Sequence, residues 1–212
     1  LIGDRYHKAE EIEEGLRPAF QSAGLTVEFC TTPDCLSPQR LSGVDLFLMY
    51  KMGQEWPQGH QQPPVVWMTR GQEVALESFV TRGGGFLGLH TAEAGYPTNG
   101  LYRRLIGGHF LRHPPLKPFT VRVVDSTHPV VRGVSDFEVK DEQHFVEYDQ
   151  GAVHVLAVSE SEDGRQPAVW VRGYGRGRVC YIANGHTREV LSLPAMQALL
   201  RNALRWCAGL TS

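Results

Sequence analysis

Histidine offers the most chemistry in this 212-residue chain, and His90 stands where α/β folds often place an active site. It follows the run Gly83–Leu89, in which three glycines stop a predicted helix and an apolar strand then begins. In doubly wound sheets, ligands bind outside the carboxyl ends of the strands. An imidazole there can carry a proton or bind a metal because its pKa lies near neutrality. The alternative is a structural histidine that satisfies buried backbone groups.

The elements around His90 predict an α/β fold. Amphipathic spacing predicts a helix that ends at Ala23-Gly24, and a dense apolar run predicts a strand covered on both faces. A second helix precedes the His90 strand, and a glycine-bearing turn predicts a hairpin near the C-terminus. The predicted strands are 25–30, 44–50, 86–90, 119–124 (as an exposed edge), 153–159, 168–172 and 178–183, and the later helices are 72–81, 101–106 and 195–207.

Composition excludes several classes of protein. The formal net charge is −2 without a basic stripe, so we expect no nucleic-acid partner. No apolar run approaches the ~20 residues that span a bilayer, so we expect no membrane contact. The four cysteines match no common zinc or redox spacing, which favours reduced thiols and a cytoplasmic location. We expect one domain over residues 1–212, with the first strand, which ends near Asp4, beginning upstream of Leu1.

Five ordered segments carry a resemblance to a known family. They are GGGFLGLH (83–90), GGHF (107–110), HPVVRGV (128–134), FEVKDE (137–142) and PAVWVRGYGRGRVCYIANGH (167–186). Together they resemble the ThuA-like family, named for trehalose utilisation, within the class I glutamine amidotransferase-like superfamily. The resemblance implies a flavodoxin-like three-layer α/β/α fold, with a mostly parallel doubly wound sheet and an added antiparallel hairpin.

The sequence departs from the relatives that cleave glutamine. Those proteins carry a nucleophilic cysteine in the turn after this strand, whereas no cysteine lies between Cys35 and Cys180. Cysteine-dependent amidotransferase chemistry is therefore excluded. His90 stands near the place of that nucleophile, and His186 resembles the partner histidine, with Glu189 available to orient it. Two facing histidines suit acid–base work or metal binding better than acyl transfer, so we predict that both are catalytic.

Other residues are expected at the same edge. Asp4 and His7 follow the first strand, so topology should put them beside His90 and His186. Zinc commonly takes three protein ligands and leaves one position open, so His7, His90 and His186 are candidate metal ligands. Asp4 and His7 are also predicted to bind substrate.

Two strand ends and a glycine-flanked histidine complete the predicted site. Adjacent residues on a strand face opposite sides, so only one of Asp141 and Glu142 can enter the cleft. We predict Glu142 as catalytic and Asp141, Tyr50 and His109 as substrate-binding. Members of the family usually show Asp-Glu followed by a tyrosine two residues on, whereas this chain has His144.

The favoured interpretation is an enzyme of carbohydrate metabolism. It would act on a sugar or keto-sugar, related to trehalose or glucosides, by histidine acid–base or metal-assisted chemistry. The cofactor would be a divalent metal such as zinc, and the partners a small carbohydrate and a second copy in a homodimer. The alternative is a non-catalytic carbohydrate-binding or regulatory module on the same fold.

Overall fold

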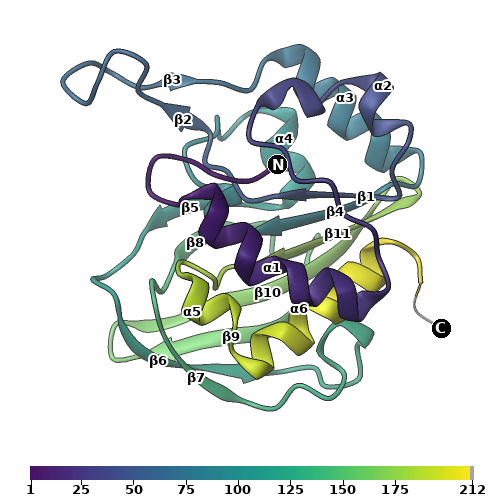
Figure 1. The fold of residues 1–212 in the computed structure, drawn as a ribbon. Helices are drawn as coiled ribbons and strands as arrows, with labels where there is room; N and C mark the ends of the chain where they lie inside the picture. Colours follow the sequence, from purple (N-terminus) through teal and green to yellow (C-terminus); the bar gives the residue numbers. More distant parts are fainter. Residues whose placement is uncertain (211–212) are drawn as a thin grey trace.

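A seven-stranded mixed sheet forms the centre of the computed structural model, which describes residues 1–210 (Figure 1). Three neighbouring strands are parallel and the remaining pairings are antiparallel. In spatial order the strands are β1 (Leu46–Met49), β4 (Gly85–Leu89), β11 (Gly177–Ile182), β10 (Gly164–Tyr174), β9 (His154–Ser161), β6 (Lys117–Val123) and β7 (Phe137–Asp141).

The α/β class and the C-terminal hairpin are confirmed, but the prediction of a mostly parallel sheet is wrong. Only β1, β4 and β11 run parallel, with one further parallel bridge from Ile2 to Tyr50. The reason is connection length. Two residues join β9 to β10 and two join β10 to β11, and so short a link can only connect antiparallel strands. The flavodoxin-like description with a mostly parallel sheet therefore does not fit this mixed sheet.

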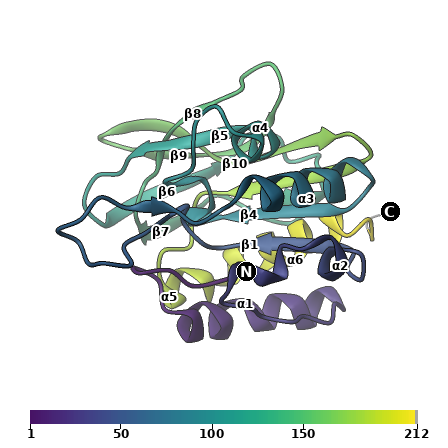
Figure 2. The same ribbon diagram turned by 90° about the horizontal axis from the view of Figure 1, so that it is seen from above.

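Helices cover both faces of the parallel strands (Figure 2). One face carries α1 (Ala9–Ala23), α5 (Arg188–Leu191) and α6 (Pro194–Cys207), and the other carries α3 (Arg70–Thr81) and α4 (Leu101–Ile106). The short helix α2 (Pro38–Leu41) packs against α3. Side chains alternate along β4, so Leu87 and Leu89 join the core under α1 and α6, whereas Phe86 joins the core under α3. Every residue of β4 is buried as a result.

Smaller elements flank this core. They are the hairpin of β2 (Gln54–Glu55) and β3 (Val65–Val66), the pair of β5 (Gly108–Arg112) and β8 (Phe145–Tyr148), and the 3-10 turns η1 (Pro33–Cys35), η2 (His90–Glu93) and η3 (Pro129–Val131). Within residues 1–210, no helix has the length and apolar character needed to cross a bilayer.

Two strand predictions need correction. Residues 25–30 have no regular strand structure, although the carbonyl of Cys30 accepts a hydrogen bond from the N–H of Ile2 (2.9 Å). The segment predicted as an exposed edge became β6, which pairs with β9 on one side and β7 on the other. The polarity of β6 alternates because side chains on one face of the strand are buried and those on the other face are more exposed. Both edges of the strand are paired.

Candidate functional site

His90 is held in a strained turn directly after β4. It is the one residue other than glycine with a positive φ (48°) among the described residues. Such backbone is costly, and it persists where surrounding contacts fix it. Here its Nδ1 lies 2.9 Å from the carbonyl oxygen of Ala183, and its own carbonyl accepts a hydrogen bond from the Tyr181 hydroxyl (2.7 Å). Because a carbonyl only accepts, Nδ1 carries the proton and Nε2 of the neutral ring presents a lone pair.

His7 reaches the same point from the N-terminal segment, after the Ile2–Tyr50 bridge. Its Nδ1 lies 2.8 Å from Oδ1 of Asp4, and its Nε2 lies 3.0 Å from Nδ1 of His186. Asp4 is itself fixed by backbone N–H groups, including that of Met52 at 3.1 Å. Asp4 therefore orients the ring of His7 and leaves its Nε2 facing the other histidines.

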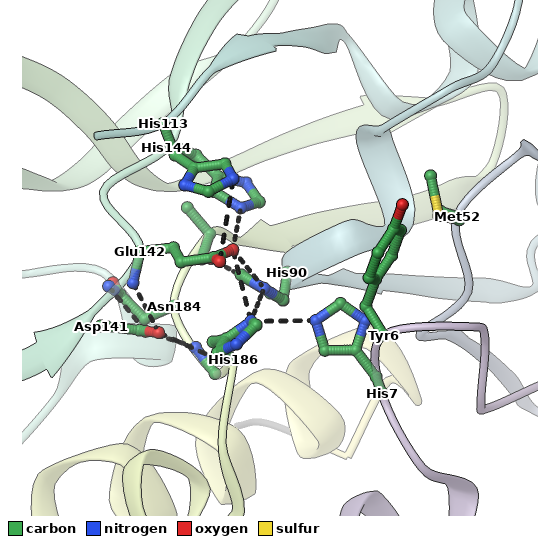
Figure 3. Close-up of polar contacts among 12 residues, drawn as sticks. Tyr6, His7, Met52, His90, His113, Asp141, Glu142, His144, Asn184 and His186 are labelled. Atoms are coloured by element: carbon green, nitrogen blue, oxygen red, sulfur yellow. Dashed lines mark hydrogen bonds and ion pairs between the residues drawn. The ribbon is translucent and has the colours of Figure 1, made fainter. Parts of the chain in front are cut away.

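His186 follows β11 and is positioned through its backbone. Asp141 accepts hydrogen bonds from the N–H groups of Gly185 (2.8 Å) and His186 (3.1 Å). Nδ1 of His186 then lies 3.2 Å from Nε2 of His90 and 3.3 Å from Oε2 of Glu142. Figure 3 shows these rings converging beside the Glu142 carboxylate. The structure therefore brings together His7, His90, His186 and Glu142.

Burial and charge give these groups different protonation states. Burial lowers the pKa of His7 and of His90, so both rings are neutral at pH 7. The hydrogen bond with Glu142 raises the pKa of His186. Burial alone would raise the pKa of Glu142, but hydrogen bonds with His186 and His90 hold it well below its usual value. Without a metal, the raised pKa of His186 and the lowered pKa of Glu142 both favour an ion pair between these two residues, beside two neutral imidazoles.

The same atoms fit a divalent metal. The ligand nitrogens of His7, His90 and His186 lie within 4.8 Å of one another. Ligand atoms of a tetrahedral zinc with bonds of about 2.0–2.1 Å lie about 3.3 Å apart, close to the 3.0 and 3.2 Å measured from Nδ1 of His186. Asp4 on His7 and the Ala183 carbonyl on His90 are the outer partners that metal-binding histidines usually have. A metal would displace the proton of His186.

Several predicted residues support the cluster without facing a cavity. Tyr50 is completely buried and donates its hydroxyl hydrogen bond to the Gly185 carbonyl (2.7 Å), so the predicted contact with substrate does not fit it. Asp141 and Asp4 are likewise occupied by backbone N–H groups and hold His186 and His7 in place. These three residues position the site.

Two other predicted residues lie outside the cluster. His109 is on β5, where its Nε2 lies 3.9 Å from Glu147, a distance too long for a hydrogen bond. The prediction that Glu189 orients His186 is wrong, because its exposed carboxylate pairs with Arg188 instead. Glu189 lies at the start of α5, which turns its side chain to solvent.

Sequence reasoning missed three residues around Glu142. The ring of His144 packs against that of His90 with centroids 4.4 Å apart and a tilt of 32°, and His113 faces Glu142 from the loop after β5. Behind His144 lies the buried carboxyl of Glu93, 3.3 Å from Nδ1. Burial raises the pKa of Glu93 to about 8 and lowers that of His144 to about 4. The sequence held one signal for these three residues: the chain has histidine at position 144, where members of the family usually have tyrosine.

Two aromatic side chains, Tyr6 and Trp56, lie next to the segments that carry His7 and Met52. Tyr6 is 57 % exposed, adjacent in sequence to His7, and makes an edge-to-face contact with Trp56 at 6.2 Å between centroids. The segment that carries Trp56 is tied to the site, because the Met52 N–H binds Asp4. Figure 3 shows Tyr6 standing next to His7.

Comparisons with known proteins agree with this architecture. Residues 3–207 match the family described as trehalose utilisation, ThuA. A putative ThuA-like protein from Parabacteroides merdae superposes with a TM-score of 0.78 at 18% identity, over 98% of this chain and 88% of that one. One from Bacteroides uniformis gives 0.71 at 21% identity, over 95% and 87%. The β-galactosidase of Rahnella sp. R3 gives 0.66 at 19% identity, over 99% of this chain and 28% of that enzyme. A comparison with curated protein sequences found no significant match.

Proposed function

Because the chain belongs to the ThuA family of trehalose utilisation, we propose that it is an enzyme of carbohydrate metabolism that acts on a sugar or keto-sugar. One observation carries the proposal. Lone-pair nitrogens of two neutral histidines and a third imidazole converge within 4.8 Å beside an ionised carboxylate. Nδ1 of His186 has one hydrogen to share among three acceptors, Nε2 of His7, Nε2 of His90 and Oε2 of Glu142, whereas a bound cation would interact with all of these groups at once.

The reaction that suits these groups is proton abstraction from the carbon next to a carbonyl. His7, His90 and His186 would hold a divalent metal, which would polarise the carbonyl oxygen as a Lewis acid. Glu142 is ionised at neutral pH, and its Oε2 lies 3.3 Å from His186, so it is placed to take the proton. The electron pair of the broken C–H bond moves to the carbonyl oxygen.

Polar and aromatic surfaces beside the cluster support a sugar as substrate. Tyr6 and Trp56 offer ring faces and edges on which the C–H face of a sugar can pack. The sugar's oxygens would then face His186 and Glu142, which are more exposed than His7 and His90. This arrangement would place a ring carbon next to the carboxylate.

Metal content and turnover of keto-sugars test the proposal. We expect purified protein that has been dialysed against zinc to retain metal. It should also convert 3-keto-glucose or 3-keto-trehalose, measured as consumption of the keto-sugar. His90→Ala should abolish both properties, whereas His154→Ala should preserve them, because His154 is a surface histidine paired with Asp125. A wild-type protein that binds no metal and turns over neither keto-sugar would refute the proposal.

A non-catalytic carbohydrate-binding module is the second candidate. The similarity to part of a β-galactosidase favours it, because that likeness shows this fold inside a larger carbohydrate enzyme. Tryptophan fluorescence during titration with trehalose or glucose distinguishes the two functions. A module binds the sugar without turnover and keeps binding it in His90→Ala, whereas the enzyme loses turnover in that variant.

A further inference from the structure

His113 faces Glu142 from the side opposite to His186 (Figure 3). It lies in the loop between β5 and β6, and its Nε2 is 3.7 Å from Oε1 of Glu142. The other ring nitrogen, Nδ1, lies 2.9 Å from the carbonyl oxygen of Pro114, which only accepts hydrogen bonds. Nδ1 therefore carries a hydrogen, and the neutral ring directs the lone pair of Nε2 at the Glu142 carboxylate. The proposed function does not use this histidine.

Glu142 needs a route by which the proton that it takes from the substrate can leave. A general base must lose that proton before it can act again. Only 17 % of the Glu142 side chain is exposed, so its own contact with water is limited. The free nitrogens of His7, His90 and His186 would hold the proposed cation and could not accept the proton. A further base beside Glu142 would carry the proton outward.

Exposure distinguishes the two imidazoles that remain beside Glu142. The side chain of His144 is 3 % exposed, whereas that of His113 is 37 % exposed. The ring of His113 also packs against Phe110 and His144, with centroids 5.8 and 6.2 Å away. These contacts hold the ring beside the carboxylate while part of it reaches solvent. Of these two imidazoles, His113 is therefore the one that connects Glu142 with water.

We propose that His113 accepts the proton from Glu142 and passes it to solvent. The proposal rests on the proposed function, because Glu142 must first take the proton from the sugar. The O–H bond of the Glu142 carboxyl breaks and its electron pair stays on the carboxylate, while an N–H bond forms at Nε2 of His113. The imidazolium then gives this proton to water or to a buffer base, which restores the neutral ring. An imidazole suits both transfers because it gains and loses a proton near neutral pH.

The transfer needs one small movement. The distance of 3.7 Å exceeds by about half an ångström the range of about 2.6–3.2 Å over which a proton passes along a hydrogen bond. Such catalytic hydrogen bonds are often long in the absence of substrate and shorten when it binds. A half-turn of the Glu142 carboxyl exchanges Oε1 and Oε2, because the terminal torsion of a glutamate side chain is broad. A proton taken at either oxygen can therefore reach Nε2 of His113.

Chemical rescue tests this role. We would measure turnover of 3-keto-glucose and 3-keto-trehalose by the zinc-loaded full chain in dilute buffer at about pH 7. A positioned proton-transfer group contributes about 10²–10⁴-fold, so His113→Ala should lower kcat at least about tenfold with little change in KM. Added imidazole should restore turnover, because it can enter the vacated space and take the proton, whereas an equal concentration of sodium chloride should not.

Two further variants serve as controls. His113→Gln fills the vacated space with a side chain that cannot transfer a proton, so it should be as slow as His113→Ala and less well rescued by imidazole. His154→Ala removes a surface histidine and should behave as wild type in every buffer. Circular dichroism and the thermal midpoint check that the variants fold, which we expect because His113 is partly exposed.

The outcomes separate this proposal from the proposed function. If wild type converts a keto-sugar and His113→Ala is equally fast in dilute buffer, the proton-transfer role is overturned and the proposed function stands. A slow variant that imidazole does not rescue also overturns the role, because the loss would then be structural. A wild-type protein without turnover overturns both. Nitrogen-15 NMR of chelator-treated protein is independent of turnover: a neutral His113 ring with its hydrogen on Nε2 instead of Nδ1 would overturn the proposal.

Discussion

Replacing Asp4 by asparagine changes one atom of the site and tests how His7 is held. Asp4 accepts hydrogen bonds from Nδ1 of His7 at 2.8 Å and from the N–H groups of Tyr6 (2.9 Å), His7 (3.2 Å) and Met52 (3.1 Å). Oδ1 of Asp4 accepts the bonds from His7 and Tyr6, and Oδ2 accepts the bond from Met52. In Asp4→Asn the amide oxygen can keep the Oδ1 contacts, but the amide nitrogen then opposes the Met52 N–H.

Two magnitudes follow from this geometry. A buried donor left without an acceptor costs about 1–3 kcal/mol, so the free energy of unfolding should fall by that amount. Loss of the outer carboxylate of a metal-bound histidine typically lowers metal affinity about 10–100-fold. The affinity change follows because a neutral amide polarises the Nδ1–H of His7 less than a carboxylate does, which makes Nε2 a weaker ligand.

Urea unfolding and zinc competition with a chromophoric chelator measure the two effects. Asp34→Asn is the matched control, because Asp34 is exposed in η1, far along the chain from the cluster. The reasoning fails if Asp4→Asn binds zinc within about threefold of wild type, since the outer carboxylate would then do nothing for the ligand. It also fails if the control changes as much as the variant.

Three other substitutions test the backbone and the charges. His90→Gly should be more stable than His90→Ala by about 1 kcal/mol in urea unfolding, because glycine adopts the positive φ of this turn without strain; equal stabilities would contradict this. Glu142→Gln should lower the thermal midpoint of chelator-treated protein more at about pH 6 than at about pH 9. The pKa of His186 is raised in the folded protein, so the ion pair stabilises the fold fully below the pKa of unfolded histidine, near 6.5. This contribution disappears as pH rises through the folded pKa of His186. A loss of thermal midpoint that does not depend on pH would argue against the ion pair. Gly85→Ala should lower the free energy of unfolding by about 1–3 kcal/mol, because the new Cβ would lie 2.3 Å from the carbonyl oxygen of Cys207. An unchanged urea midpoint would contradict this and show that α6 can move away.

The convergence of His90 and His186 was predictable from the sequence because parallel strands end at one edge of a sheet. His90 and His186 follow β4 and β11, which pair in parallel register, so their convergence follows from topology. His7 follows the Ile2 bridge to the same edge. The family membership and the α/β class were also predictable, since ordered motifs extend along nearly the whole chain.

The antiparallel half of the molecule was less predictable from local patterns. His144 and His113 lie beyond strands whose order depends on tertiary pairing, and no spacing rule connects residue 113 with residue 144. The alternation rule allowed only one of Asp141 and Glu142 to enter the cleft without saying which. The structure answers this, because Asp141 is taken up by the N–H groups of Gly185 and His186.

The His7–His186 contact also affects how the molecule folds. It joins residues 179 positions apart, near the two ends of the chain. Closing so long a loop is entropically costly, so we expect this contact to form after the intervening sheet. A partly folded chain therefore cannot present the three imidazoles together, and proton or metal binding by the cluster would report completed folding. Detachment of the N-terminal segment alone would remove His7 from the cluster while most of the sheet remains in place.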